Sequence, residues 1–204
     1  AGAMGRGIAQ IAAQAGSQVW LYDTQPGATG KAREALFQTW DKLLEKGKLS
    51  AEAVAGHKAR LKEAAGLQDL AACELVVEAI VEKIEVKKAV FADLEKTVAP
   101  DAVLVTNTSS LSVTAIAAGM QHPGRFAGYH FFNPVPLMKV VEVIAGLKTD
   151  AAVCQRLTEF ARQMGHTPVQ AQDTPGFIVN HAGRGYGTEA LRIVSEGVAD
   201  FATI

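Results

Sequence analysis

The 204-residue sequence has only two cysteines, Cys73 and Cys154, and no long uninterrupted apolar run. Two cysteines are too few for a disulfide scaffold or for a metal cluster of their own. Gly, Lys or Glu breaks every apolar stretch before it reaches the length needed to cross a bilayer. An excess of charge is also absent, because 20 Lys and Arg residues face 21 Asp and Glu residues. We therefore expect neither nucleic acid nor a membrane surface as a partner.

The residues that are present are typical of a globular protein, with 49% apolar and 20% charged residues. At about 150 residues per domain, this length allows one large domain, or one domain and part of another. No secretory signal pattern is visible, so we expect a cytoplasmic protein.

Short apolar strands alternate with amphipathic helices along most of the chain. The pattern predicts strands at 18–22, 75–80, 103–105, 126–130, 140–144 and 167–170, and helices at 28–46, 83–98, 114–118, 150–164 and from residue 50. This alternation is typical of an α/β fold, a mostly parallel sheet with helices on both faces. Thr174-Pro175-Gly176 interrupts the pattern, and the remainder up to residue 204 is expected to be helical.

The first residues, Ala1-Gly2-Ala3-Met4-Gly5, form a glycine-rich turn that runs directly into a helix. Gly2 and Gly5 match the second and third glycines of G-x-G-x-x-G, so we expect the first glycine and the first strand to precede Ala1. A backbone without side chains lets a pyrophosphate approach the free N–H groups of a helix N-terminus. A glycine run of this kind can also be an ordinary turn.

Asp23 strengthens the interpretation of the glycine turn, because it stands at the end of the next strand. A carboxylate at that place can bind both ribose hydroxyls of a dinucleotide. It also repels the 2′-phosphate of NADP, so the sequence favours NAD as the cofactor. The alternative role for Asp23 is a helix cap or a turn residue.

A histidine and a glutamate lie on consecutive strands in the second half of the pattern. Glu142 stands within the apolar run 140–144 and, if buried there, needs a partner. His130 is the candidate, because a carboxylate–imidazole pair holds a base in one tautomer. Asn107 and Ser109 follow the end of another strand, where ligands of open α/β sheets bind. A lone histidine at a strand end is more often structural.

Five short motifs carry a resemblance to a known family. They are Gly2-x-x-Gly5 with Met4, VEAIVE at 77–82, NTSSL at 107–111, HFFNP at 130–134 and DTPGF at 173–177. Together they resemble the L-3-hydroxyacyl-CoA dehydrogenase family, including the 3-hydroxybutyryl-CoA dehydrogenases, over essentially the whole chain. Residues 181–186 are similar to the longer bacterial members linked to phenylacetate breakdown.

The resemblance implies two domains and an oligomeric state. Residues 1–173 would form an NAD-binding domain of the Rossmann type, with its first strand missing, and residues 174–204 the beginning of an all-α C-terminal domain. Family members usually dimerise through that helical domain, so a homodimer is expected. We expect no metal site, because no cluster of metal-ligating residues is visible.

The resemblance also implies an enzyme of fatty acid β-oxidation, which oxidises an L-3-hydroxyacyl-CoA thioester to the 3-ketoacyl-CoA with NAD. His130 is then the general base and Glu142 orients it, while Ser109 and Asn180 hydrogen-bond the substrate oxygens. The residues expected along the dinucleotide are Gly2, Ala3, Met4, Gly5, Asp23, Glu82, Lys87, Ser109 and Asn133. Lys46 falls where family members meet the coenzyme A phosphates, although a lysine on a surface helix is more often only solvated.

Two other functions remain open. A sugar-acid dehydrogenase of the gulonate type resembles the same pattern and would need no coenzyme A site. A non-catalytic, NAD-binding structural protein is disfavoured because both His130 and Glu142 are present.

Overall fold

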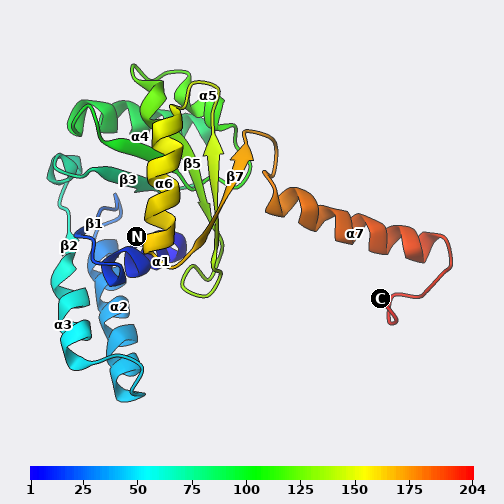
Figure 1. The fold of residues 1–204 in the computed structure, drawn as a ribbon, viewed down its shortest axis with the longest axis horizontal. Coiled ribbons are helices and arrows are strands. Elements are labelled where there is room, and N and C mark those ends of the chain that lie inside the picture. The colour runs from blue at the N-terminus through cyan, green and yellow to red at the C-terminus, as the bar shows by residue number, and fades with distance from the viewer.

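The computed structural model describes residues 1–204, which contain two β-sheets (Figure 1). The larger sheet has the strand order β3-β4-β5-β6-β7, with β3 at Leu75–Glu78, β4 at Val103–Thr106, β5 at Phe126–Phe131, β6 at Val140–Ala145 and β7 at Thr167–Gln172. Neighbouring strands are parallel except for the antiparallel pair β5 and β6. The smaller sheet pairs β1 (Val19–Leu21) in parallel with β2 (Leu61–Glu63).

Seven α-helices lie before, between and after the strands in sequence. They are α1 (Ala3–Gln14), α2 (Ala28–Glu45), α3 (Ala51–Arg60), α4 (Ile84–Thr97), α5 (Val113–Ala117), α6 (Ala151–Gln163) and α7 (Val179–Ser195), with short 3₁₀ turns at Leu67–Leu70 and Pro123–Arg125. The predicted α/β fold with a mostly parallel sheet is confirmed. None of these helices combines the length and apolar character that crossing a bilayer requires.

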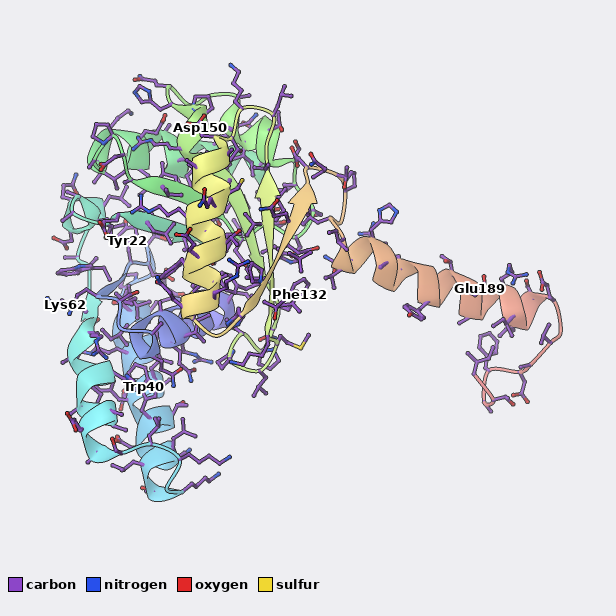
Figure 2. All side chains as sticks on the ribbon, viewed as in Figure 1. Tyr22, Trp40, Lys62, Phe132, Asp150 and Glu189 are labelled. Atoms are coloured by element: carbon purple, nitrogen blue, oxygen red, sulfur yellow. The ribbon has the colours of Figure 1, made fainter.

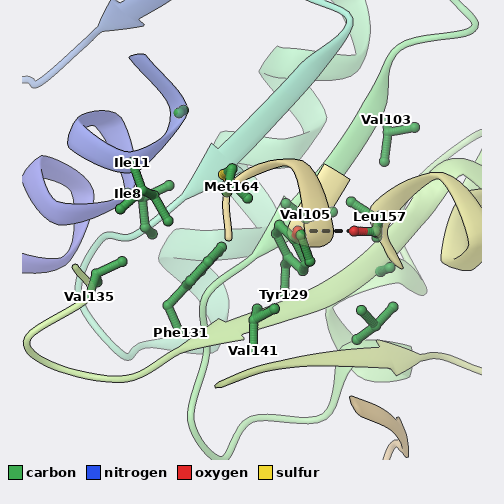
Figure 3. Packing of buried hydrophobic residues seen from close by; sticks show 14 of the residues in the cluster. Ile8, Ile11, Val103, Val105, Tyr129, Phe131, Val135, Val141, Leu157 and Met164 are labelled. Atoms are coloured by element: carbon green, nitrogen blue, oxygen red, sulfur yellow. Dashed lines mark hydrogen bonds between the residues drawn. The ribbon is translucent and has the colours of Figure 1, made fainter. Parts of the chain in front are cut away.

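Alternating residues of the central strands face opposite helix layers. In β4, Val103 and Val105 belong to the core that contains α1 and α6, whereas Leu104 belongs to the core that contains α4 and α5. Figure 3 shows the first of these cores, where the hydroxyl of Tyr129 donates to the carbonyl oxygen of Leu157 in α6 at 3.0 Å. Both faces of the sheet are therefore covered, as the short apolar strands predict.

Two strands differ from the prediction: one is not predicted at all, and one is shorter than predicted. Strand β2 is not expected, because three residues directly after α3 are too few to show a period. The strand expected at 75–80 ends at Glu78, where the N–H of Ile80 turns back to donate to Glu78 Oε1 at 2.6 Å.

Two parts of the chain extend away from the larger sheet (Figure 1). Helices α2 and α3 form a hairpin whose apolar side packs around Trp40, which is fully buried. Helix α7 follows β7 and has no buried residue along its length. The helix expected after Gly176 is present but ends at Ser195, so the expectation of helix up to residue 204 is wrong for residues 196–204. The domain boundary at residue 173 stays a prediction.

Helix α1 approaches the chain segment after β5 closely at Gly7, a residue to which the sequence analysis gives no role. A Cβ atom at Gly7 would lie 2.8 Å from Cβ of Val135. Val135 is itself buried in the core beside Ile8 and Ile11 (Figure 3). The space between α1 and this segment therefore admits only glycine without a shift of the backbone.

We predict that Gly7→Ala lowers the free energy of unfolding by about 1–2 kcal/mol. Overpacking a core costs about 1–3 kcal/mol, and the better helix propensity of Ala returns about 0.5–1 kcal/mol. Urea unfolding of Gly7→Ala and of Gly119→Ala provides the comparison, because a Cβ at Gly119 meets no atom within 4 Å. Equal midpoints for the two variants would show that α1 can move away from Val135 without cost.

Candidate active site

The N-terminus of α1 opens onto free space. The helix begins at Ala3 directly after Gly2, no side chain caps it, and its first turn contains no acidic residue. A Cβ at either Gly2 or Gly5 would meet no atom within 4 Å. The backbone N–H groups of the first turn can therefore bind an anion at close range, as a dinucleotide pyrophosphate requires.

Asp23 lies beside this turn. Its Oδ2 is 2.6 Å from the amino nitrogen of Ala1, and its Oδ1 accepts from the N–H of Gln25 at 2.9 Å. The structure thus brings together the glycine turn and the carboxylate that the sequence pairs with it.

His130 and Glu142 lie directly opposite each other on the antiparallel strands β5 and β6. Nδ1 of His130 is 2.7 Å from Oε2 of Glu142, and the two residues are 3% and 0% exposed. Because a carboxylate only accepts, Nδ1 carries the proton and Nε2 presents its lone pair. The hydroxyl oxygen of Ser109 lies 3.0 Å from that Nε2.

The other oxygen of Glu142 contacts the start of α7. The backbone N–H groups of Ile178 and Val179 donate to Oε1 at 2.8 and 2.9 Å. Further along, the side-chain amide of Asn180 is 3.5 Å from the carbonyl oxygen of Ser109. His130, Glu142, the first turn of α7 and Ser109 therefore form a closed ring of polar contacts.

Aromatic rings flank the imidazole of His130. Phe132, labelled in Figure 2, has its ring centroid 4.5 Å from that of His130, and the centroid of Phe177 lies 5.7 Å away. Neither ring offers a hydrogen bond. The hydrogen-bond partners of the imidazole are consequently Glu142 and Ser109.

A second polar network lies at the C-terminal ends of β3 and β4. The ammonium group of Lys87, from a residue that is 1% exposed, is 2.7 and 2.9 Å from the two oxygens of Glu78 and 3.2 Å from Oε2 of Glu82. The hydroxyl of Thr106 also donates to Glu78, at 2.7 Å. Lys87 therefore forms ion pairs with two carboxylates, and its charge does not face solvent.

Glu82 connects this network to Ser109. It accepts from the hydroxyl of Thr108 and, at 2.9 Å, from the N–H of Ser109. Burial alone would raise the pKa of the Glu82 carboxyl, but the bonds from Thr108, Ser109 and Lys87 together lower it. Glu82 is thus an anion that holds the loop carrying Ser109.

Two residues expected at the site lie outside these networks. Asn133 is exposed in the segment between β5 and β6, and Lys46 is exposed at the tip of the α2–α3 hairpin (Figure 1). Glu78, Thr106 and Thr108 belong to these networks and are not predicted from the sequence. The two glutamates of the VEAIVE motif are the signal that could have indicated a charged network at the end of β3.

Comparisons with known proteins agree on one family. The model described as "3-hydroxyacyl-CoA dehydrogenase, NAD binding domain" matches residues 1–174. The chain is 46% identical over 198 residues to 3-hydroxyadipyl-CoA dehydrogenase of Escherichia coli (strain K12), covering 97% of this chain and 42% of that protein. It is 43% identical over 202 residues to a probable 3-hydroxybutyryl-CoA dehydrogenase of Deinococcus radiodurans, covering 98% of this chain and 72% of the other.

A solved structure gives the same result. The crystal structure of 3-hydroxybutyryl-CoA dehydrogenase from Escherichia coli K12 superposes with a TM-score of 0.94 at 46% identity, over 97% of this chain and 42% of that one. The present chain therefore spans less than half the length of this relative.

We predict that Lys87→Met lowers the free energy of unfolding by about 3–5 kcal/mol, because it leaves the Glu78 carboxylate buried without its cation. The double variant Glu78→Gln with Lys87→Met is expected to recover a large part of the loss, since no buried charge remains at either position. Urea unfolding of the wild type and both variants measures the difference. If Lys87→Met unfolds at the wild-type midpoint, the network does not depend on this cation.

Proposed function

The chain belongs to the 3-hydroxyacyl-CoA dehydrogenase family, and from this premise we propose that it catalyses the NAD-dependent oxidation of an L-3-hydroxyacyl-CoA thioester to the 3-ketoacyl-CoA. The observation that carries the proposal is the buried His130–Glu142 pair with Ser109 at its free nitrogen. The names of the relatives favour an acyl-CoA thioester over a sugar acid, because they specify 3-hydroxyadipyl-CoA and 3-hydroxybutyryl-CoA.

The residues at the carboxyl ends of the strands fit NAD. The open N-terminus of α1, from Gly2 through Ala3 and Met4 to Gly5, receives the pyrophosphate, and Asp23 beside it accepts the ribose hydroxyls. Glu82, Ser109 and Asn133 are assigned to the same dinucleotide. Lys87 acts on it through Glu82, since its ammonium group is buried against that carboxylate.

The chemistry follows from the hydrogen-bonding capacity of each group. NAD bound by these residues would supply the acceptor for the hydride of the carbinol carbon. The hydroxyl proton must leave as the carbonyl forms, and Nε2 of His130, the ring nitrogen that does not contact Glu142, is the atom whose lone pair can accept it. Glu142 stabilises the resulting imidazolium. Ser109 and Asn180 hydrogen-bond the substrate oxygens.

Residues 174–204 begin a helical domain, and the apolar residues of α7, which the α/β unit does not cover, pack in a homodimer. Lys46, at the tip of the α2–α3 hairpin, meets the coenzyme A phosphates.

Formation of NADH by the full-length protein with a panel of 3-hydroxyacyl-CoA thioesters and with L-gulonate tests the substrate class. Activity with the sugar acid alone would overturn the proposal.

We predict that His130→Ala lowers kcat by about 10²–10⁴-fold, the usual effect of removing a positioned acid–base group. Glu142→Gln should also lower kcat, and the double variant should lose little more than His130→Ala alone, because the two residues act as one unit. NAD affinity, measured by titration, is expected to stay close to that of the wild type. Near-normal turnover by His130→Ala would show that another group accepts the proton.

We predict that Asp23→Ala weakens NAD binding by about 1–3 kcal/mol, the scale of charge-assisted hydrogen bonds, and narrows the preference for NAD over NADP. Fluorescence titration with both dinucleotides measures the change. Asp93→Ala serves as the control, because Asp93 is an exposed carboxylate on α4 whose side-chain ion pair is with Lys96. Comparable affinities of the wild type for NAD and NADP would contradict the role of Asp23.

A further inference from the structure

The turn between β7 and α7 has an unusual backbone. Gly176 has a φ of 80° and Phe177 has a φ of 49°, and Phe177 is the one residue other than glycine with a positive φ. Bulky residues rarely adopt this left-handed conformation, and where they do it often marks a functional site. Phe177 is nevertheless well packed, since it is 4% exposed within the core that contains α4 and α5.

The turn is fixed at both of its ends. On its N-terminal side, the carboxylate of Asp173 accepts from the hydroxyl of Ser112 and from the N–H groups of Val113 and Thr114 at 2.8–2.9 Å. Burial alone would raise the pKa of Asp173, but these bonds together lower it, so its carboxylate stays ionised and anchors the turn. On the C-terminal side, the buried ring of Phe177 packs in the core, with its centroid 5.7 Å from that of His130 in β5.

The left-handed turn directs the next two N–H groups at one buried oxygen. Ile178 and Val179 both donate to Oε1 of Glu142, a residue with no exposed surface. The first N–H groups of a helix have no partner within the helix, and a carboxylate with no access to water must find its donors in the protein. The two N–H groups and the carboxylate therefore satisfy each other's need for a hydrogen-bond partner.

We propose that the backbone N–H groups of Ile178 and Val179 are positioning groups for the base, holding Glu142 so that its other oxygen faces Nδ1 of His130. This inference rests on the proposed function, in which His130 accepts the substrate proton. With Oε1 occupied by two donors, Oε2 is directed to the imidazole, and Nε2 keeps its lone pair toward the substrate. The position of the N-terminus of α7, the helix that also carries Asn180, thereby sets the orientation of His130.

The test removes one of these N–H groups and keeps every side chain. In the full-length protein, Val179 is replaced by the corresponding α-hydroxy acid, which turns the amide N–H into an ester oxygen and keeps the side chain. The same replacement at Val198 is the matched control, because the N–H of Val198 donates to the carbonyl oxygen of Ile193, away from Glu142. We expect kcat to fall about tenfold or more at position 179, as small misplacements of catalytic groups do, with KM for NAD within about twofold.

The proton NMR signal of His130 Nδ1–H provides a readout that a purely structural role would not move. We expect this signal to shift or broaden when the ester is at position 179 and to stay unchanged when it is at position 198. Unchanged kcat and an unchanged signal at position 179 would overturn the proposal, and so would equal losses at both positions.

Hydrogen exchange of the Ile178 and Val179 amides tests the contact even if the ester variant does not fold. Exchange should be faster in Glu142→Ala than in Glu142→Gln, because glutamine retains an acceptor oxygen. Equal exchange in the wild type and in Glu142→Ala would overturn the proposal. If the wild type oxidises no 3-hydroxyacyl-CoA, the proposed function fails, while the exchange rates and the Nδ1–H signal still decide whether α7 positions the pair.

Discussion

A single buried carboxylate, Glu142, sets the arrangement of the site. It lies in the middle of β6 with no exposed surface, so every hydrogen bond that stabilises its charge must come from the protein. The register of β5 and β6 provides His130, and the turn after β7 provides two backbone N–H groups. One side chain consequently fixes the relative positions of β5, β6 and the turn after β7.

Ser109 is the point at which the two polar networks meet. Its N–H donates to Glu82, its hydroxyl contacts His130, and its carbonyl oxygen faces Asn180. The Glu78–Lys87–Glu82 network therefore fixes the backbone of this residue, while the His130–Glu142 pair fixes its side chain. A serine held from both sides keeps a constant distance between the end of β4 and the imidazole.

The sequence predicts those features that leave a trace in residue type or spacing. The alternation of strands and helices gives the α/β fold, and a glutamate among valines indicates the partnership with His130, which lies 2.7 Å away. Glycine spacing and Asp23 likewise indicate adjacent parts of one site. Strand β2 is too short to show a period, and the need for glycine at position 7 depends on the distant Val135. The N–H groups of Ile178 and Val179 cannot be predicted from residue types at all, because every residue except proline has one.

The antiparallel return of β6 has a consequence for the order in which the site assembles. His130 and Glu142 are 12 residues apart and belong to a local hairpin, whereas Ile178 and Val179 are 36 and 37 residues from Glu142. The entropy lost in closing a loop grows with its length, so the hairpin contact forms at the lower entropic cost. During folding, the carboxylate can thus acquire its imidazole partner from its own neighbourhood before β7 and α7 arrive. The buried Glu142 carboxylate then has a partner before Ile178 and Val179 contact it.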